Sequence, residues 1–459
     1  MPIAAVKAHI NWKVGRHLIR NYPDAAARKF IRAIEAKPSD DNRARRAVEM
    51  LFFAGRLDAA RFISQSRMSS EVDRLHYWRH YDSFLNELKL GVAAENSRPE
   101  GTVRVALFND TDYRVNIGCR LTSQGLKYAI RQAIPDAEIS SRGFNFQTFR
   151  RDFGGCDASM TIADFRNGGK LRERIEAAYG ASANAAIERA DLVVVQPEGS
   201  LDDDTPLDGI LTFFAPAILA HLLGRPSAIL NGTIPIYHDS RGSFLWQLFA
   251  EFPAVAARDQ MSAEFYDIKF LPDAALLHDF AASSVEKDGC LITTGARNSP
   301  EEDLHILRRA LEVCDATNLR PVILTRASGR FRNLESDILS RGGVLAETAG
   351  ILHAANTISG CRLHVGGRYH MAIFSHVAGV PSLLYDVKTH KNQWLSEYSP
   401  LVTLVRHKRS VVEEAITALQ LPKHAMCATA DIEEAYRDFF RQATTAAVSA
   451  AQSSIALVT

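Results

Sequence analysis

Residues 359–394 read SGCRLHVGGRYHMAIFSHVAGVPSLLYDVKTHKNQW and contain the alternation that decides the fold. A short apolar run ends at Gly366-Gly367-Arg368-Tyr369-His370, and a helix-like stretch follows until Gly379-Val380-Pro381. A second apolar run, residues 382–385, leads into a charged turn. The order is strand, turn, helix, strand and turn, as in a parallel sheet covered by helices. Arg368 and His370 therefore fall at the carboxyl end of a strand, where open α/β sheets bind their ligands.

The same alternation continues over most of the chain. Apolar strand candidates lie at 102–108, 192–196, 227–230, 255–257, 290–294, 321–324, 363–365 and 382–385. Helical stretches lie between them, for example at 118–134, 210–223 and 301–314. The pattern starts again at Cys290, after a mixed polar segment. We therefore predict an α/β protein with two Rossmann-like domains facing across a cleft, at residues 101–285 and 288–410.

The two ends of the chain are predicted to be helical. Residues 1–97 show no strand-like alternation and contain amphipathic pieces of the kind found in tetratricopeptide (TPR-like) helical hairpins. Such a region is either a cap packed on the next domain or an arm that binds a partner. Residues 411–459 are predicted to form C-terminal helices followed by a flexible, Ala/Ser-rich tail.

The composition is that of an ordinary soluble protein, with 46% apolar and 23% charged residues. Residues 1–100 carry 18 lysines and arginines against 12 acidic residues, whereas the remainder carries 36 against 41. The basic excess of the helical arm could contact an anionic membrane surface, a partner protein or an acidic glycan. A solvated basic helix face is the simpler explanation and the one that we favour. We expect no nucleic-acid partner.

The six cysteines show neither CxxC pairs nor metal-ligand spacing, which indicates reduced thiols rather than disulfides or a zinc site. Residues 1–20 lack the apolar run of a signal peptide, and no stretch approaches the length of a membrane span. We expect a cytoplasmic protein, with the inner face of the membrane as a surface to which the basic arm could attach. No GxxxxGK[ST], HExxH, GxSxG or GxGxxG sequence occurs, which disfavours nucleoside triphosphate, zinc-protease, serine-hydrolase and dinucleotide chemistry.

Several polar residues follow the predicted strands of the first domain and are candidates for the cleft. They are Asn116, Gly118, Glu198, Asn231 and Arg258. Each has a structural alternative, since an Asn before a helix is a common cap and an Arg beside an Asp is a common ion pair. The consecutive acids Asp202-Asp203-Asp204 are interpreted as a solvated loop rather than a metal site.

The second domain offers a basic set of candidates. Gly295 and Arg297 begin a helix after a strand, which is a plausible seat for a phosphate group. Lys388 follows the last predicted strand. Arg368 carries a planar fork for a carboxylate or phosphate, and His370 can exchange a proton near neutral pH. A second triplet, Arg362-Leu363-His364, lies within a strand and is interpreted as structural.

The sequence resembles the polysaccharide pyruvyl transferase family over roughly residues 103–395. The Arg368-Tyr369-His370 triplet stands after Gly-Gly and before a helix ending in Gly-Val-Pro, as in the family signature. Arg258-Asp259 with Ser262, followed by Pro272-Asp273, matches the middle region of the family. The chain departs from the family at Gln196-Pro197-Glu198, where a Gly-rich turn is usual.

The resemblance implies a GT-B-like pair of domains and a particular reaction. A pyruvyl group would pass from phosphoenolpyruvate to two hydroxyls of a sugar in a bacterial-type surface polysaccharide or its precursor, giving a cyclic ketal. The acceptor would be a glycan or a lipid-linked saccharide, and neither a metal nor a cofactor would be required.

The resemblance also implies roles for the candidate residues. His370 would supply the proton and Arg368 would act beside it. Arg297, Gly295 and Lys388 would bind the donor, while the candidates of the first domain would line the acceptor side. Two alternatives stay open: a GT-B-type glycosyltransferase that uses a nucleotide-sugar, and a non-catalytic relative that carries the helical arm. The altered Gln196-Pro197 turn keeps the second alternative open.

Overall fold

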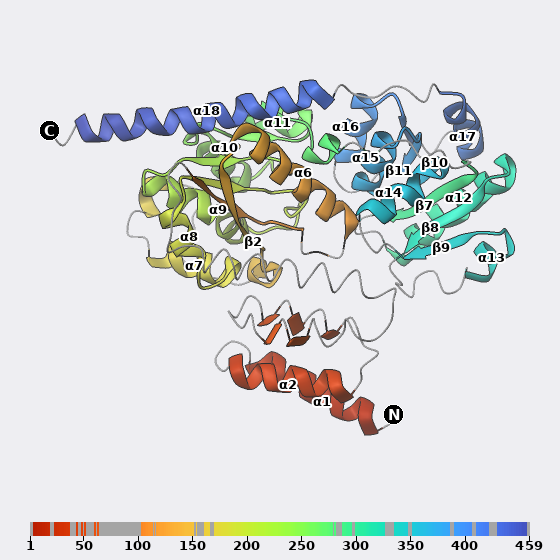
Figure 1. Ribbon diagram of the computed structural model, residues 1–459, viewed down its shortest axis with the longest axis horizontal. Coiled ribbons are helices and arrows are strands. Elements are labelled where there is room, and N and C mark those ends of the chain that lie inside the picture. Colours follow the sequence, from red (N-terminus) through yellow and green to blue (C-terminus); the bar gives the residue numbers. More distant parts are fainter. Residues whose placement is uncertain are drawn as a thin grey trace.

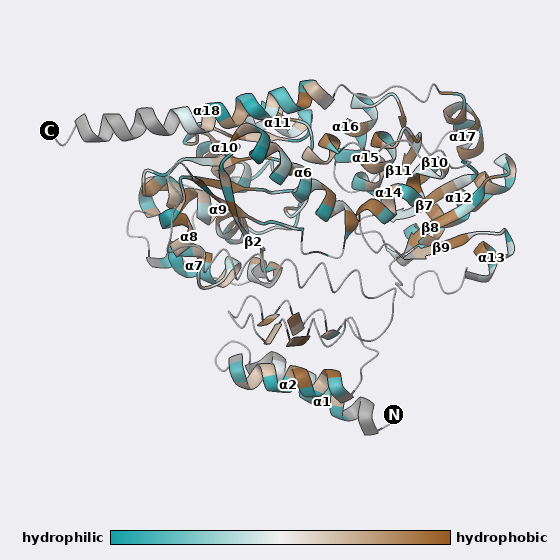
Figure 2. Ribbon diagram, viewed as in Figure 1, coloured by the Kyte–Doolittle hydropathy of each residue, from teal (hydrophilic) through white to brown (hydrophobic). Residues whose placement is uncertain are grey.

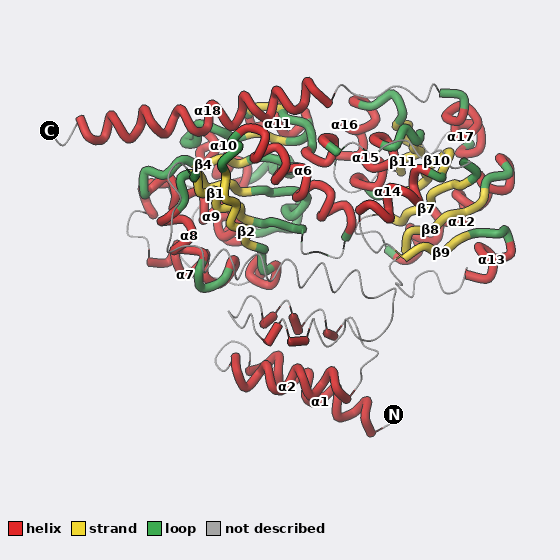
Figure 3. Tube along the Cα trace, viewed as in Figure 1, coloured by secondary structure: helices red, strands yellow, loops and turns green. Residues whose placement is uncertain are grey.

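The fold is taken from a computed structural model of the 459-residue chain. The structure describes residues 3–18, 23–36, parts of 43–63, 102–150 without 113 and 115, 153, 160–165, 169–278, 280, 287–295, 299–325, 335–347, 351–385, 390–405, 410–421 and 429–456. Figure 1 shows two α/β domains side by side, with the N-terminal helices at one edge. Figure 3 shows the strands of the two sheets separately.

The first domain is built on a parallel sheet in the order β2-β1-β3-β4. Its strands are β1 (Val103–Phe108), β2 (Ala137–Arg142), β3 (Leu192–Val195) and β4 (Ser227–Ile229). A bridge from Ile229 to Val255 continues the sheet toward the short parallel pair β5 (Ala256–Ala257) and β6 (Lys269–Phe270). The connections reverse direction between β1 and β3, and such a switch point opens a crevice at the carboxyl ends of the strands.

Helices cover both faces of this sheet. They are α6 (Ile117–Ala133), α7 (Gly169–Tyr179), α8 (Ala183–Arg189), α9 (Leu207–Leu222), α10 (Ser240–Ala250) and α11 (Gln260–Tyr266), with 3₁₀ turns η2 (Phe146–Arg150), η3 (Ile162–Phe165) and η4 (Ala274–Leu277). The sequence LVVV of β3 is buried at every position, as expected for a central strand covered on both faces.

The second domain contains a parallel six-stranded sheet in the order β12-β11-β10-β7-β8-β9. Its strands are β7 (Gly289–Gly295), β8 (Arg320–Thr325), β9 (Val344–Glu347), β10 (Cys361–Gly367), β11 (Ser382–Tyr385) and β12 (Val402–Val405). Its helices are α12 (Pro300–Thr317), α13 (Glu335–Ser340), α14 (Ile351–Ser359), α15 (Tyr369–Val377), α16 (Lys391–Tyr398) and α17 (Val411–Leu419). Read from β9 to β12, the order is the Rossmann order, with its switch point between β7 and β10.

The prediction of two Rossmann-like domains is confirmed by these two sheets, and the second sheet begins at Gly289, where the alternation restarts. In Figure 2 the hydrophobic colour follows strands β7, β8 and β9. Four strands were not predicted: β2, β6, β9 and β12. β6 has only two residues. The other three lie at the edge of a sheet and are only partly buried, so their sequences lack long apolar runs.

A shared apolar core joins the two domains. One continuous cluster of buried residues includes Leu126 and Ile130 of α6, Leu276 of η4, and Ile373 and Phe374 of α15. Burial of apolar surface is the main stabilising term in such a contact. The interface therefore fixes the position of α15 against α6, and with it the geometry between the domains.

The C-terminal helix α18 (Thr429–Ala456) returns to the first domain after the chain has completed the second. Its Ile432, Tyr436 and Phe440 belong to the same buried cluster as α6 and η4. The Tyr436 hydroxyl donates a hydrogen bond to the Pro272 carbonyl at 2.8 Å. A polar contact also joins the domains, because His390 Nε2 lies 2.8 Å from Asp259 Oδ1.

The N-terminal helices α1 (Ile3–Leu18) and α2 (Pro23–Ala36) pack against each other. The rings of Trp12 and Phe30 lie 5.1 Å apart, and both belong to a separate cluster of buried residues that extends to Ile63. The TPR-like interpretation and the choice between cap and arm stay predictions. Among the described residues, no helix has the length and hydropathy needed to cross a membrane.

Candidate active site

A cavity of about 560 Å³ lies between the two domains, at the carboxyl ends of their strands. From the first domain it is lined by Arg114, Asn116, Cys119, Phe146, Glu198, Gly199, Ser200, Leu201, Asp202, Asp203, Asp204, Thr233 and Arg258. From the second domain it is lined by Arg368, Tyr369, His370, Met371 and Lys391. The volume falls within the range of sites that bind small molecules. The structure thus brings Arg368 and His370 together with Asn116, Glu198 and Arg258.

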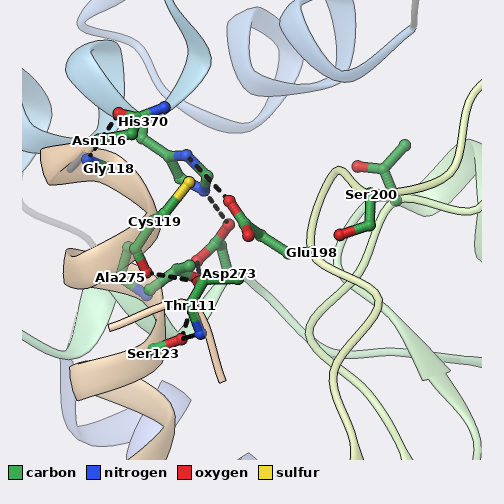
Figure 4. A network of polar contacts seen from close by, with 12 residues as sticks. Thr111, Asn116, Gly118, Cys119, Ser123, Glu198, Ser200, Asp273, Ala275 and His370 are labelled. Carbon is green, nitrogen blue, oxygen red and sulfur yellow. Dashed lines mark hydrogen bonds and ion pairs between the residues drawn. The ribbon is translucent and has the colours of Figure 1, made fainter. Parts of the chain in front are cut away.

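His370 stands in the first turn of α15, directly after β10. The end of β10 that leads to it needs glycine, because a Cβ on Gly366 would lie 2.0 Å from Thr293 Oγ1. Across the domain interface, a Cβ on Gly118 would lie 2.4 Å from the Cβ of His370. Figure 4 shows the start of α6 against the His370 side chain. Gly118 is therefore required by the close approach of two helix N-termini.

Three charged groups from the first domain surround the His370 ring (Figure 4 shows two of them). Nε2 lies 3.0 Å from Arg258 Nη1 and 3.4 Å from Asp273 Oδ2. Nδ1 lies 4.0 Å from Glu198 Oε1. The imidazole ring therefore lies between one cation and two carboxylates of the first domain.

Arg258 is fully buried and its guanidinium is held in one position. Nη1 donates to Asp273 Oδ2 at 2.7 Å, and Nε donates to Thr233 Oγ1 at 3.1 Å. The guanidinium carbon lies 4.8 Å from the centre of the Tyr369 ring, in the geometry of a cation–π contact. The remaining nitrogen, Nη2, is buried and has no hydrogen-bond partner among the described residues. A buried donor of this kind in a cavity wall is suited to an anionic ligand.

Asp273 is the carboxylate that organises this group. Burial alone would raise its pKa, but the Arg258 charge and the contact with His370 hold the pKa well below the ordinary value. Its Oδ1 accepts hydrogen bonds from Thr122 Oγ1 at 2.6 Å and from the Ala275 amide at 2.9 Å. The sequence analysis noted Pro272-Asp273 only as part of a family pattern. It did not place Asp273 beside His370, which is 97 residues further along the chain.

Left-handed backbone marks three consecutive strand ends of the first domain. Asn109, Glu198 and Asn231 have φ angles of 58°, 51° and 63°. Non-glycine residues seldom adopt this conformation, and it is concentrated at sites where surrounding contacts enforce it. Glu198 is held on both sides, since its amide donates to the Asn231 carbonyl and its carbonyl accepts from the Thr233 amide. The result is a buried carboxylate that lines the cavity.

The Gln196-Pro197 turn, where the chain departs from the family that it resembles, is built into the domain. Gln196 Nε2 donates to Ser123 Oγ at 2.8 Å, and its Oε1 accepts from Asn231 Nδ2 at 3.0 Å. A Cβ on Gly232 would lie 2.3 Å from Pro197 Cβ, so the two strand ends are in close contact. The turn therefore keeps Glu198 in the cavity wall without a Gly-rich sequence.

The loop of Asp202-Asp203-Asp204 is both exposed to solvent and part of the cavity wall. Its backbone is anchored, because the Tyr237 hydroxyl donates to the Asp202 carbonyl at 2.6 Å and Arg241 Nη1 donates to the Asp203 carbonyl at 2.6 Å. The carboxylates of Asp203 and Asp204 are exposed beside the cavity. They give the first-domain wall an acidic end, opposite in charge to its arginines.

The predicted phosphate seat in the second domain has its own carboxylates. The Gly295 amide donates to Asp303 Oδ1 at 3.1 Å. The Ser299 amide donates to Glu302 Oε2 at 2.6 Å, and Ser299 Oγ completes a capping box at the start of α12. These acids already satisfy the positive end of the helix, and Gly295 is not among the cavity-lining residues.

The remaining predicted site residues differ in whether they line the cavity. Asn116 lines the cavity and also caps α6, accepting from the Gly118 amide at 3.1 Å. Asn231 is fully buried inside the first domain, where its amide contacts Thr122, Gln196 and Ala274, and it does not line the cavity. Arg297 and Lys388 lie outside the described residues. Lys391, which the sequence analysis did not propose, lines the cavity.

His364, the histidine interpreted as structural, is enclosed in the second sheet. Its Nε2 lies 2.8 Å from Thr293 Oγ1 and its Nδ1 lies 3.1 Å from Ser382 Oγ. Burial lowers its pKa to about 3, so the ring stays neutral near neutral pH. It is not one of the described residues that line the cavity. Within the same described ranges, no cluster of three His, Cys, Asp or Glu side chains could hold a metal ion.

The fold and the cavity define an α/β protein with a ligand cleft between two Rossmann-like domains and a His/Arg/Asp group in that cleft. The sequence model of the polysaccharide pyruvyl transferase family matches residues 116–389. This match covers more than half of the chain and includes every described residue of the group around His370. The protein belongs to the polysaccharide pyruvyl transferase family.

Comparison with solved structures gives matches at low identity. The chain is 12% identical to UDP-GlcNAc 2-epimerase from Neisseria meningitidis, with 74% of this chain and 98% of that chain covered and a TM-score of 0.47. It is 12% identical to a mutant O-GlcNAc transferase from Thermobaculum terrenum, with 98% of both chains covered and a TM-score of 0.39. No curated protein matches the chain in sequence.

Proposed function

We propose that this protein transfers a pyruvyl group from phosphoenolpyruvate to two hydroxyls of a saccharide, which is part of a surface polysaccharide or its precursor, and forms a cyclic ketal. The observation that carries the proposal is the contact of His370 with the buried Arg258–Asp273 pair, at the wall of a cavity that Arg368 and Lys391 also line. The match to a family of pyruvyl transferases over residues 116–389 supports the proposal.

The cations of the cavity suit the two anionic groups of phosphoenolpyruvate. Arg258 offers the unpartnered Nη2, while Arg368 and Lys391 enter the same cavity from the second domain. Arginine binds carboxylate and phosphate oxygens with directional, charge-assisted hydrogen bonds. In a buried site such contacts are stronger than in water, because solvent does not screen them. The donor would thus bind with its carboxylate and phosphate held by groups from both domains.

The reaction needs one proton at carbon and one at phosphate. Protonation of the methylene carbon of phosphoenolpyruvate makes the adjacent carbon an oxocarbenium-like centre, which a saccharide hydroxyl attacks. Loss of phosphate regenerates such a centre, and the second hydroxyl closes the ring. The two hydroxyls release two protons, of which one replaces that given to the methylene and the other leaves with hydrogen phosphate. His370 is the proposed acid for the first step.

Glu198 is the proposed acceptor-side base. Its Oε1 is 4.0 Å from His370 Nδ1, so a hydroxyl group can lie within hydrogen-bond distance of both atoms. A carboxylate in this position can orient the attacking hydroxyl and take up its proton. The exposed carboxylates of Asp203 and Asp204 stand further along the same wall, where saccharide hydroxyls could donate to them.

The side-chain contacts at the start of α12 favour phosphoenolpyruvate over a nucleotide-sugar as the donor. A diphosphate commonly binds at a helix N-terminus after a Rossmann strand. Here Glu302 and Asp303 already accept hydrogen bonds at that position. A diphosphate placed there would meet two carboxylates and lose affinity through charge repulsion.

The proposal is tested by incubating the protein with phosphoenolpyruvate and a panel of saccharides. We expect phosphate release that depends on the saccharide, together with a product heavier by pyruvic acid minus one water. Phosphoenolpyruvate alone should raise the melting temperature, since a ligand that binds only the native state stabilises it. Stabilisation by nucleotide-sugars with no response to phosphoenolpyruvate would reject the proposal in favour of a glycosyltransferase.

A further inference from the structure

The two ring nitrogens of His370 have different surroundings. Nε2 is enclosed by Arg258 Nη1 at 3.0 Å and Asp273 Oδ2 at 3.4 Å, and both of those side chains are fully buried. Nδ1 lies on the side of Glu198, which is a cavity-lining residue. Nδ1 is therefore the nitrogen that can exchange a proton with a bound ligand.

Arg258 restricts the protonation of His370. An arginine only donates hydrogen bonds, so Nη1 can bond to Nε2 only while Nε2 carries no proton. When both ring nitrogens are protonated, two cationic groups stand about one hydrogen-bond length apart inside the protein. Such a pair is strongly unfavourable in a medium of low dielectric unless an anion lies between them.

Asp273 supplies that anion. Its Oδ2 lies 2.7 Å from Arg258 Nη1 and 3.4 Å from His370 Nε2, so one oxygen faces both cations. Its Oδ1 is committed to Thr122 and the Ala275 amide, which fix the carboxylate plane. The low pKa of Asp273 keeps this group ionised over the working range of pH.

We propose that Asp273 is a positioning residue that allows His370 to hold a proton beside Arg258 and to deliver it through Nδ1. When His370 gains its second proton, its Nε2–H donates a hydrogen bond to Asp273 Oδ2. The proton on Nδ1 can then be transferred to a ligand. The catalytic meaning of this step rests on the proposed function. The dependence of the His370 charge on Asp273 is a property of the resting protein and can be measured without substrate.

Other charged and titratable groups near His370 come from every neighbouring element. Glu198 follows β3, Cys119 belongs to α6, Arg368 and Tyr369 start α15, and Lys391 starts α16. Burial raises the pKa of the Cys119 thiol and of the Tyr369 hydroxyl, so both stay neutral. These groups are unchanged in variants of Asp273 or Arg258. A shift in His370 titration between such variants therefore reports on the altered residue.

The first test is a titration of the His370 ring by NMR in the full-length protein, with the signal assigned by comparison with His370→Gln among the 15 histidines. Asp273→Asn should lower the pH midpoint of His370 by roughly one unit or more, because the compensating charge is lost. Arg258→Met should raise it, because the competing cation is lost. The second variant keeps the test decisive if the first one does not fold. A midpoint that stays unchanged, or moves in the opposite direction in either variant, would overturn the proposal.

The second test is the pH dependence of kcat. Asp273→Asn should reduce kcat. It should also move the alkaline limb of the pH–kcat profile, where kcat falls as the pH rises, toward lower pH, since the protonated form of His370 becomes rarer. Asp273→Glu should restore part of kcat and should return the alkaline limb part of the way to its native pH. His364→Gln, which alters a histidine enclosed in the second sheet by Thr293 and Ser382, should leave the limb in place. A limb unaltered in Asp273→Asn would refute the positioning role.

The two proposals can fail separately. If the native protein transfers no pyruvyl group but the NMR midpoints move as expected, the proposed function fails and the role of Asp273 stands. If transfer occurs but the midpoints do not move, the role of Asp273 fails and the proposed function stands.

Discussion

Gly118 of α6 and His370 of α15 meet so closely that a single added methyl group on Gly118 would lie 2.4 Å from His370 Cβ. The two residues belong to different domains, and each stands in the first turn of its helix. The approach of the two helices therefore sets the position of the imidazole relative to Arg258 and Asp273. The sequence suggested Gly118 as a ligand-binding residue. In the structure it packs against His370, the proposed acid, and holds that side chain in place.

Gly118→Ala should impair turnover more than it impairs folding. The methyl group would push His370 away from its position, and a displacement of about 1 Å in a reacting group can cost roughly 100-fold in rate. Overpacking should also cost about 1–3 kcal/mol of stability. The measurements are kcat and the free energy of unfolding by denaturant. Gly289→Ala, whose Cβ would lie 3.0 Å from Cys361 Sγ at the start of β7, is the control for overpacking alone. Equal loss of kcat in both variants would contradict the expectation.

His370→Gln should lower kcat by roughly 10²–10⁴, because glutamine keeps some hydrogen bonding but cannot transfer the proton. Binding of phosphoenolpyruvate, measured by calorimetry, should change little. His364→Gln is the matched control, since that ring contacts only Thr293 and Ser382 among the polar partners described. It should cost stability of about 1–3 kcal/mol and leave kcat close to native. The assignment of the acid is wrong if His364→Gln abolishes turnover while His370→Gln spares it.

Arg368→Lys should weaken donor binding while leaving measurable turnover. Lysine keeps the positive charge but loses the planar fork that contacts two oxygens of a carboxylate or phosphate. We expect the KM for phosphoenolpyruvate to rise by roughly 10-fold or more, with a smaller change in kcat. Thr294→Val removes the hydroxyl that lies 3.5 Å from Arg368 Nη2 and serves as a milder control. An unchanged KM in Arg368→Lys would remove Arg368 from the donor site.

Acid should destabilise the protein through two buried histidines. Burial lowers the pKa of His364 to about 3 and that of His376 to about 4, both below the ordinary value of 6.5. The unfolded chain therefore binds more protons than the native state between these pKa values and 6.5. Stability is fully present above 6.5 and falls as the pH drops, by up to about 1.4 kcal/mol per pH unit for each ring.

Denaturant unfolding at about pH 7 and about pH 5 measures this effect, with His364→Gln as the diagnostic variant. Removing one of the two titrating rings should make the stability of that variant less dependent on pH than the stability of the native chain. An equally steep pH dependence in the variant would show that His364 is not buried as a neutral ring.

The sequence predicted the central strands and the site triplet but not the contacts between distant residues. The buried run of β3 and the Gly-Gly-Arg-Tyr-His segment, which ends β10 and begins α15, have local signatures, because burial on both faces and a strand end are properties of a few consecutive residues. The edge strands β2, β9 and β12 have weak signatures, because they are half exposed. Asp273 has no local signature of its role, since only the packing of η4 against α15 brings it to His370.

Two further features were beyond sequence reasoning for the same reason. The left-handed conformation of Glu198 is enforced by contacts with residues after β4, not by its own preference. The anion seat predicted at Gly295 depended on an open helix start, whereas Asp303 and Glu302 occupy it through side-chain rotamers that a motif does not specify. The assignments of Arg297 and Lys388 to the donor stay predictions.

The return of α18 to the first domain should make the C-terminal helix essential for folding. Phe439 and Phe440 are buried, and Tyr436 contacts the carbonyl of Pro272, directly before Asp273. Ending the chain after residue 428 would expose the apolar surface of α6 and η4, so we expect insoluble protein. Phe440→Ala should cost about 3–5 kcal/mol of stability, and Tyr436→Phe about 1 kcal/mol.

Ending the chain after Thr445 is the control for this prediction, because it leaves every buried α18 residue described here in place. That shortened protein should unfold at the same denaturant concentration as the full chain and retain its turnover. The shared core across α6, η4 and α18 would also transmit the Tyr436→Phe change to Asp273, so its effect on the His370 midpoint should exceed that of a surface substitution on α18 such as Arg441→Lys. A soluble and active protein ending at residue 428 would show that the first domain does not need α18 to complete its core.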